Sequence, residues 1–318
     1  MILWKIVFQV IINIGDNMKD IISKHEDMVF RLIGLIVLVI IVLITSKIIS
    51  FNNSDYHKLT KLGYTKEEAK EIISLDKGKK VLNYEYNEAM LSILKSKYYI
   101  DKNLIYYIDY YNAHKNESMN NIIAIVNVHA NEDFYSLDLE TDTSKGIQML
   151  VNKYYGLTEE YEPEVVTIKN WYCYGNQKIA DEVYDHFITM WNAAKKDDLS
   201  LIINDSYRSY KEQDETYKRY GDDYAARPGH SEHNTGLAID IISPTSSGST
   251  FDTTEEFEWL SKHAHEYGFI LRYPKDKEFL TGYEYESWHY RYVGVELATK
   301  IYNEGITFDE YYAYYLDK

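Results

Sequence analysis

The chain has 318 residues, enough for a membrane anchor and one or two compact domains. A hydrophobic fraction of 45% and only four prolines are typical of a folded chain and exclude a disordered one. The formal net charge of −16 argues against a nucleic-acid partner, because binding to phosphates needs basic surface.

Residues 29–50 form an apolar stretch that predicts one membrane-spanning helix. Arg31 and Lys47 lie near its ends, where their charged heads can reach the membrane surface. A buried core helix is the alternative interpretation. No small-residue cleavage site follows the stretch, so we expect an uncleaved anchor and not a removed signal peptide. Residues 1–28 would then precede the anchor as a separate N-terminal segment.

The sequence pattern of residues 51–158 predicts a mainly helical spacer that contains no group of catalytic residues. Thr65 and Glu68 have the spacing of a capping box at the start of a helix. Alternating apolar residues within 121–139 predict a strand or two.

Residues 159–318 predict an α+β domain, because helical and strand-like patterns alternate along them. We expect helices at 177–194 and 253–267, and strands at 199–204, 269–273 and 283–293. The chain has a single cysteine, Cys173, so it can form no intrachain disulfide. An extracytoplasmic domain without disulfides favours a Gram-positive bacterial surface over a eukaryotic secretory route.

Two short segments carry the residues with the clearest chemistry. His233 and Asp240 lie in the first segment, and Glu286 and His289 lie 46 residues beyond it. Catalytic zinc sites take three protein ligands and leave one position for water, from which a nearby carboxylate accepts a proton. Taken singly, Asp240 and His233 also fit a hydrogen-bonded core pair, and Glu286 fits a solvated surface acid. Together the four residues predict a metal site.

The spacing of Glu286 and His289 makes a geometric demand. The composition of residues 283–293 favours a strand, and on a regular strand residues three apart point to opposite faces. If both residues serve one metal ion, the backbone must bend or bulge near Ser287.

These segments, with their surroundings, resemble the zinc D-alanyl-D-alanine carboxypeptidases of the VanY type, within the LAS or hedgehog-fold peptidases. The resemblance covers roughly residues 160–300, and Ser287 departs from it because the family often has proline there. It implies a small antiparallel sheet flanked by helices that carries a zinc site. The matching stretches are residues 206–209 with Gln213, then 228–240, 267–274 and 286–292.

The resemblance also implies a role for each site residue. His233, Asp240 and His289 would bind Zn²⁺, and Glu286 would act as the general base. Arg208 matches the family arginine that stabilises charge on the scissile carbonyl or holds the peptide carboxylate. Gln213 and Ser231 match positions that line the substrate site, although a structural hydrogen-bonding role fits each of them equally well.

The expected function is therefore removal of the terminal D-alanine from peptidoglycan stem peptides by a single-pass membrane protein. The substrate lies outside the membrane, so we expect the N-terminus inside and the catalytic domain outside. One alternative is an endopeptidase with the same zinc centre. Another is a non-catalytic wall-binding or sensory protein that retains zinc for structure. The sequence indicates no obligate protein partner and does not separate D,D from L,D specificity.

Overall fold

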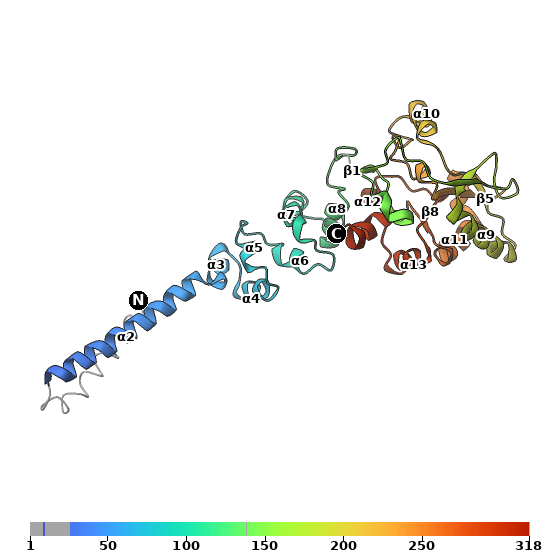
Figure 1. The fold of residues 1–318 in the computed structure, drawn as a ribbon. Coiled ribbons are helices and arrows are strands. Elements are labelled where there is room, and N and C mark those ends of the chain that lie inside the picture. Colours follow the sequence, from blue (N-terminus) through green and yellow to red (C-terminus); the bar gives the residue numbers. More distant parts are fainter. Residues whose placement is uncertain (1–8, 10–25, 138, 318) are drawn as a thin grey trace. The chain divides into compact units, whose positions relative to one another are not determined.

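The computed structural model describes residue 9, residues 26–137 and residues 139–317, which form two compact units (Figure 1). The first unit ends at Leu94, and the second begins at Lys95. Most of the predicted N-terminal segment, residues 1–28, lies outside the described residues.

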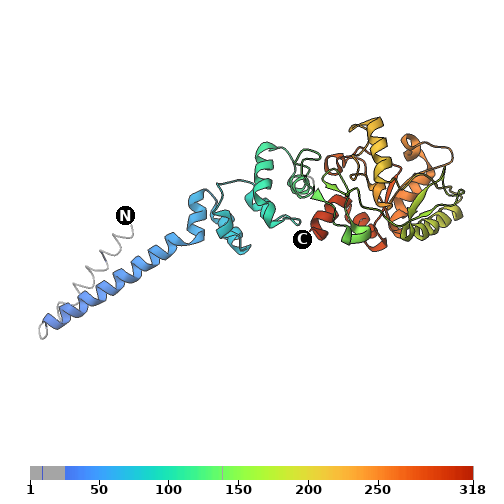
Figure 2. The same cartoon turned by 45° about the horizontal axis from the view of Figure 1, so that its top comes forward.

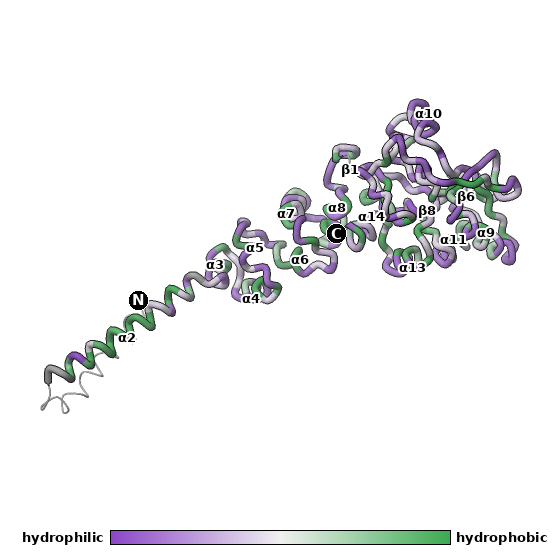
Figure 3. Tube along the Cα trace, viewed as in Figure 1, coloured by the Kyte–Doolittle hydropathy of each residue, from purple (hydrophilic) through white to green (hydrophobic). Residues whose placement is uncertain are grey.

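Helix α2, Glu26–Asn53, runs through the whole of the predicted anchor. Within it, Val29–Asn52 is long and apolar enough to cross a membrane, by length and composition. Leu35 and Leu38 are more than half exposed, and exposed large apolar side chains recur along the helix from Phe30 to Phe51. The residues of the helix are largely hydrophobic (Figure 3). An exposed apolar surface of this length favours a membrane-spanning helix over a buried core helix.

The rest of the first unit consists of short helices. Thr65 accepts a hydrogen bond from the backbone N–H of Glu68, and the Glu68 carboxylate bonds back to Thr65, which confirms the predicted capping box. The helices are α3, Asp55–Leu62; α4, Lys66–Ser74; α5, Gly78–Val81; and α6, Met90–Leu94.

A four-stranded antiparallel sheet stands at the centre of the second unit (Figure 1). The strands lie in the order β5, β6, β8, β7, so the two middle strands come from distant parts of the sequence. Helices flank this sheet, which confirms the predicted α+β class. The strands are β5, Ile202–Asp205; β6, Ala238–Ile242; β7, Phe269–Leu271; and β8, His289–Tyr292.

Helix α9, Asp181–Lys196, covers the core beside the sheet. Its buried residues Val183, Phe187, Met190 and Ala194 recur every three or four positions, and so they form one apolar face. This face packs in the same core cluster as the buried isoleucines of β5 and β6. The packing fixes the strand that carries Asp240.

One predicted strand is wrong. Helix α8, Met119–Asn127, occupies the part of residues 121–139 for which we expect a strand. Ile122, Ile123, Ile125 and Val126 are all buried, and this spacing also fits one face of a helix. The Ser118 side chain caps the helix by accepting a bond from the backbone N–H of Asn121.

The remaining elements complete the second unit. The helices are α7, Leu104–Ala113; α10, Tyr210–Tyr220; α11, Glu255–His263; α12, Glu278–Thr281; α13, Val295–Glu304; and α14, Phe308–Tyr311. Short 3₁₀ helices are η2, Asp101–Asn103; η3, Thr143–Gln148; η4, Glu232–Thr235; η5, Gly248–Thr253; and η6, Ala264–Tyr267. The π-type turn η7 is Tyr312–Leu316. The short strands are β1, Leu139–Glu140; β2, Tyr155–Gly156; β3, Val165–Thr167; and β4, Lys178–Ala180.

The C-terminal helices lie beside the segment that precedes the sheet in sequence (Figures 1 and 2). Asn152 donates a hydrogen bond of 2.8 Å to Asp309, and Lys145 donates one of 3.0 Å to the carbonyl of Leu316. Residues 95–158 therefore fold within the same compact unit as the sheet, and the domain boundary predicted at 158/159 falls inside that unit.

Candidate metal centre

The register of two neighbouring strands brings Asp240 and His289 together. Asp240 of β6 lies directly opposite His289 of β8, so their side chains share one face of the sheet. His289 Nδ1 lies 3.0 Å from Asp240 Oδ1. The neighbouring residues Ile239 and Ile241 are fully buried in the core, which leaves Asp240 to face the site.

His233 approaches the same point from the turn η4, which leads into β6. Its Nδ1 lies 2.6 Å from the carbonyl oxygen of Ser206; a carbonyl only accepts, so Nδ1 carries the proton. The lone pair is then on Nε2, which lies 3.5 Å from Asp240 Oδ1. Burial, together with the charge of Arg208, lowers the pKa of His233 to about 3, so the ring is neutral. A neutral imidazole is the form that binds a metal.

The three side chains fit a zinc ion. One ligand atom each from His233, Asp240 and His289 lies within 4.8 Å of the other two. Zinc bonds of about 2.0–2.2 Å in a tetrahedral site place ligand atoms about 3.4 Å apart. The two separations from Asp240 Oδ1, 3.5 Å to His233 Nε2 and 3.0 Å to His289 Nδ1, are close to this value. Two imidazoles and one carboxylate also leave a fourth position open, as catalytic zinc sites do.

Glu286 reaches the cluster from a turn and not from a strand. Strand β8 begins at His289, later than expected, and a turn at Ser287 and Trp288 precedes it. The His289 N–H donates a bond of 3.3 Å to the Glu286 carbonyl across this turn. The expected bend near Ser287 is therefore present, and it brings Glu286 Oε2 to 3.8 Å from His289 Nδ1.

The environment of Glu286 suits a base. Burial raises the pKa of Glu286 to about 7, with a smaller contribution in the same direction from Asp240, while His289 and Arg208 oppose the rise. The side chain is still 30% exposed, so it can contact a substrate. A carboxylate with a pKa near neutral is well matched to accepting and returning a proton.

A groove of about 940 Å³ contains all the predicted site residues, including Arg208, Gln213 and Ser231. Arg208 is tied to the metal-ligand segment, because its backbone N–H donates 3.1 Å to the His233 carbonyl. Gln213 is almost completely buried and donates 2.7 Å to the carbonyl of Ala226. Its Oε1 has no hydrogen-bond partner among the described residues. A buried acceptor of this kind is available to a substrate N–H.

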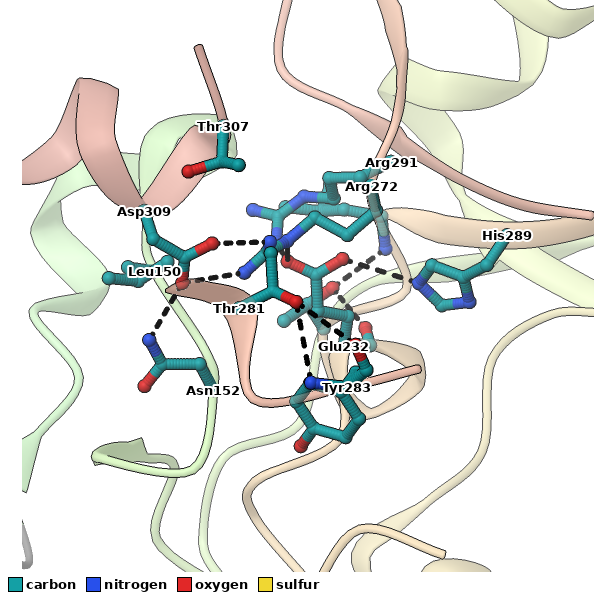
Figure 4. Close-up of polar contacts among 12 residues, drawn as sticks. Leu150, Asn152, Glu232, Arg272, Thr281, Tyr283, His289, Arg291, Thr307 and Asp309 are labelled. Atoms are coloured by element: carbon teal, nitrogen blue, oxygen red, sulfur yellow. Dashed lines mark hydrogen bonds and ion pairs between the residues drawn. The ribbon is translucent and has the colours of Figure 1, made fainter. Parts of the chain in front are cut away.

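Glu232 is a functional residue that the sequence analysis does not identify. Its Oε2 lies 3.3 Å from His289 Nε2 (Figure 4). Asp240 contacts the other ring nitrogen, Nδ1. Its Oε1 accepts bonds of 2.7 Å from Arg272 Nε and 2.9 Å from Arg291 Nη1. The side chains of Glu232 and both arginines are completely buried. Glu232 therefore orients the His289 ring, as outer carboxylates do at metal sites.

The buried charges continue away from the site. Arg272 makes a second pair of bonds, of 2.6 and 3.1 Å, to Asp309, which also accepts from Asn152 (Figure 4). Arg272 and Arg291 lie in or beside strands that are buried. Because a buried guanidinium group requires a carboxylate partner, these two positions indicate in the sequence that a cluster of ion pairs is present. The sequence does not say which carboxylates they are.

Comparison with known proteins identifies the family. Residues 176–295 match the family model of VanY, D-alanyl-D-alanine carboxypeptidase. The chain is 39% identical over 191 residues to YodJ of Bacillus subtilis (strain 168), and the match covers 55% of this chain and 70% of YodJ. The chain belongs to the VanY family.

Two further relatives of this VanY-family chain are similar over about half of its length. A D-alanyl-D-alanine carboxypeptidase of Enterococcus faecium is 40% identical over 140 residues, which are 44% of this chain and 45% of that protein. The solved structure of the LdcB LD-carboxypeptidase is 37% identical with a TM-score of 0.52, and it covers 57% of this chain and 94% of its own. The chain is thus similar both to a protein named as a D-alanyl-D-alanine carboxypeptidase and to one named as an LD-carboxypeptidase.

Proposed function

We propose that this chain is a membrane-anchored zinc carboxypeptidase that removes the terminal D-alanine from peptidoglycan stem peptides. One observation carries the proposal: His233, Asp240 and His289 place their ligand atoms within 4.8 Å of one another, with Glu286 beside them in an open groove. A purely structural zinc site usually fills all four positions with protein ligands and needs no base.

Each residue has a task that its geometry supports. Zn²⁺, held by His233, Asp240 and His289, would supply the Lewis acidity that activates a water molecule. Glu286 accepts the proton of the attacking water and then returns it to the leaving amine. The Arg208 guanidinium, in the same groove, stabilises negative charge on the scissile carbonyl or binds the substrate carboxylate.

Helix α2 supplies the proposed anchor, because its exposed apolar residues are numerous enough to span a bilayer. The substrate lies outside the membrane, so we expect the second unit on the outer side. Treatment of intact cells with an external protease tests the orientation. Release of the second unit is expected, and its survival intact would contradict this arrangement.

The activity is tested with the full chain, purified in detergent and loaded with Zn²⁺. Mass spectrometry of tetrapeptide and pentapeptide stems should show loss of one terminal D-alanine. Glu286→Gln should bind zinc with little change but lose hydrolysis by about 10²–10⁴-fold. Glu258→Gln, at an exposed ion pair with Lys262, is the matched control and should behave as wild type.

The same assay separates the alternatives. Cleavage within cross-linked peptides, with none at the terminal D-alanine, would identify an endopeptidase and contradict the proposed specificity. Zinc binding without hydrolysis of any stem would favour a wall-binding or sensory protein. Full activity of Glu286→Gln would refute the assigned base.

A further inference from the structure

Lys153 lines the same groove as Arg208 and His289 but has no role in the proposed chemistry. Its ammonium lies 4.2 Å from the centre of the Phe134 ring and 4.9 Å from that of Tyr283. Two aromatic faces of this kind hold a cation in place without neutralising it. Within the described part of the chain, no carboxylate lies close enough to Lys153 to form an ion pair.

The wall that holds Lys153 is built with unusual backbone geometry. The N–H of Tyr135 donates 3.0 Å to the Lys153 carbonyl, and Tyr135 adopts a left-handed φ of 61°, which is costly for a tyrosine. Gly282 has a φ of +74°, and a Cβ there would lie 2.9 Å from Phe134 and 3.3 Å from the Lys153 stem. The close approach of these segments therefore requires glycine at position 282.

The other two cations of the groove are already engaged. Arg227 makes two bonds of 3.0 Å to Asp222, and Arg208 lies beside the metal-ligand residues. Lys153 is half-buried, and loss of water around its ammonium lowers its pKa, although Asp222 and the exposed Glu284 act in the opposite direction. An ammonium that has lost part of its water gains more from a charged hydrogen-bond partner than a fully solvated one.

Lys153 is also within reach of a bound peptide. Tyr273 stacks on the His289 ring at 4.9 Å, and Tyr283 packs on Tyr273 at 4.6 Å, so only two aromatic rings separate Lys153 from a metal ligand. The Lys153 ammonium therefore lies no more than about 14 Å from the centre of the His289 ring. An extended peptide advances about 3.3–3.6 Å per residue, so the ammonium can meet a residue within about four positions of the cleaved bond.

We propose that Lys153 is a specificity-determining residue that binds a carboxylate of the stem peptide on the N-terminal side of the cleaved bond. The proposal rests on the proposed function. It assigns a binding role to residues 134–153, which lie outside the region that matches the family model. Recognition of a substrate carboxylate gives a role to the one cation of the groove, among the described residues, that neither pairs with a carboxylate nor lies beside the metal-ligand residues.

The test compares Lys153→Met with Lys153→Arg and wild type on four pentapeptides that end in D-alanyl-D-alanine. The second residue is D-glutamate or its α-amide, and the third is lysine or diaminopimelate, so each candidate carboxylate is present or absent. Lys153→Met keeps the apolar stem against Phe134 but removes the charge. We expect its KM to rise about tenfold for peptides with the recognised carboxylate, with kcat unchanged. Lys153→Arg should restore most of the loss.

Lys169→Met is the matched control, because Lys169 also lies over an aromatic ring, at 5.4 Å from Trp171, but not in the groove. It should match wild type on all four peptides. An equal change in KM for all four peptides with Lys153→Met would show that Lys153 recognises neither of the varied carboxylates, and would overturn the inference.

Direct titration of the same peptides into the full chain separates this inference from the proposed function. If no peptide is hydrolysed but wild type still binds the carboxylate form more tightly, and Lys153→Met abolishes that preference, the inference stands and the proposed function fails. If wild type binds all four peptides equally, the inference is wrong whatever the activity.

Discussion

Glu232→Gln removes one negative charge from a completely buried cluster. In the native structure two carboxylates, Glu232 and Asp309, balance the two guanidinium groups of Arg272 and Arg291. Glutamine keeps the shape of the side chain, but it leaves one positive charge without compensation. Breaking a buried ion pair in this way costs about 3–5 kcal/mol. Solvent does not screen these charges and so does not reduce this cost, because the side chains involved are no more than 1% exposed.

The substitution should also weaken the metal site. Glu232 accepts the Nε2–H of His289, and the glutamine oxygen can accept only a weaker, uncharged bond there. Loss of an outer carboxylate typically lowers metal affinity by about 10–100-fold. Zinc affinity, measured by competition with a chelating dye, should fall by this factor, and it is a readout independent of activity.

The acid limb of the stability curve gives a third readout. Burial acts to raise the pKa of Glu232, but the charges of Arg272 and Arg291 outweigh it and hold the pKa well below its ordinary value of 4.5. The stabilisation is therefore complete above about pH 4.5 and is lost as the pH falls below it. Glu232→Gln should lose the corresponding part of this acid dependence.

Urea denaturation of wild type, Glu232→Gln and Glu258→Gln measures the free energy of unfolding. The exposed pair of Glu258 with Lys262 should contribute no more than about 0.5 kcal/mol, so Glu258→Gln is the matched control for the charge change. If Glu232→Gln costs less than about 1 kcal/mol and leaves zinc affinity unchanged, the balanced cluster does not support His289 as described.

Other expectations follow from the same geometry. Although burial disfavours the charged ring, Asp240 and Glu232 raise the pKa of His289 to about 9, so zinc binding at pH 7 should release a proton. Calorimetry in buffers of different ionisation enthalpy measures the release, and the apparent affinity should rise about tenfold per pH unit between pH 6 and 8. Arg208→Lys should lower kcat/KM by about tenfold or more in steady-state assays, because an ammonium cannot replace a planar fork of donors. Gly229→Ala should lower the melting temperature, since Gly229 has a φ of +82° and an added Cβ would lie 2.3 Å from a backbone carbonyl oxygen. Gly305→Ala, with a φ of +63° but open space around it, should cost less.

The sequence predicts the residues of the site better than the elements that carry them. His233 and Asp240 are seven residues apart, and a local turn into one strand brings them together. The i, i+3 spacing of Glu286 and His289 requires a bend, and the turn at Ser287 supplies it. Strand propensity alone places the start of the expected strand too far upstream, because the turn at Ser287 and Trp288 precedes β8.

Helix α8 shows where local pattern fails. A run of isoleucine and valine fits either a buried strand or a buried helix, and periodicity alone does not separate them. The deciding features are the Ser118 cap and the packing of the helix beside Leu280 and Ala313, which come from the far end of the chain. Tertiary contacts outweigh the β-propensity of these residues.

The Glu232 cluster lies beyond sequence reasoning for a related reason. Each of its ion pairs joins residues that are 37 to 59 positions apart, and burial that turns a common acid into a structural charge exists only after folding. The cluster is neutral without any contribution from His289, since two arginines balance two carboxylates. His289 can therefore give up its second proton to a metal while its Nε2–H still donates to Glu232, and no buried carboxylate loses its partner. Binding of a metal would change the charge of His289. The charges of Glu232, Arg272 and Arg291, which orient the His289 ring, would stay the same.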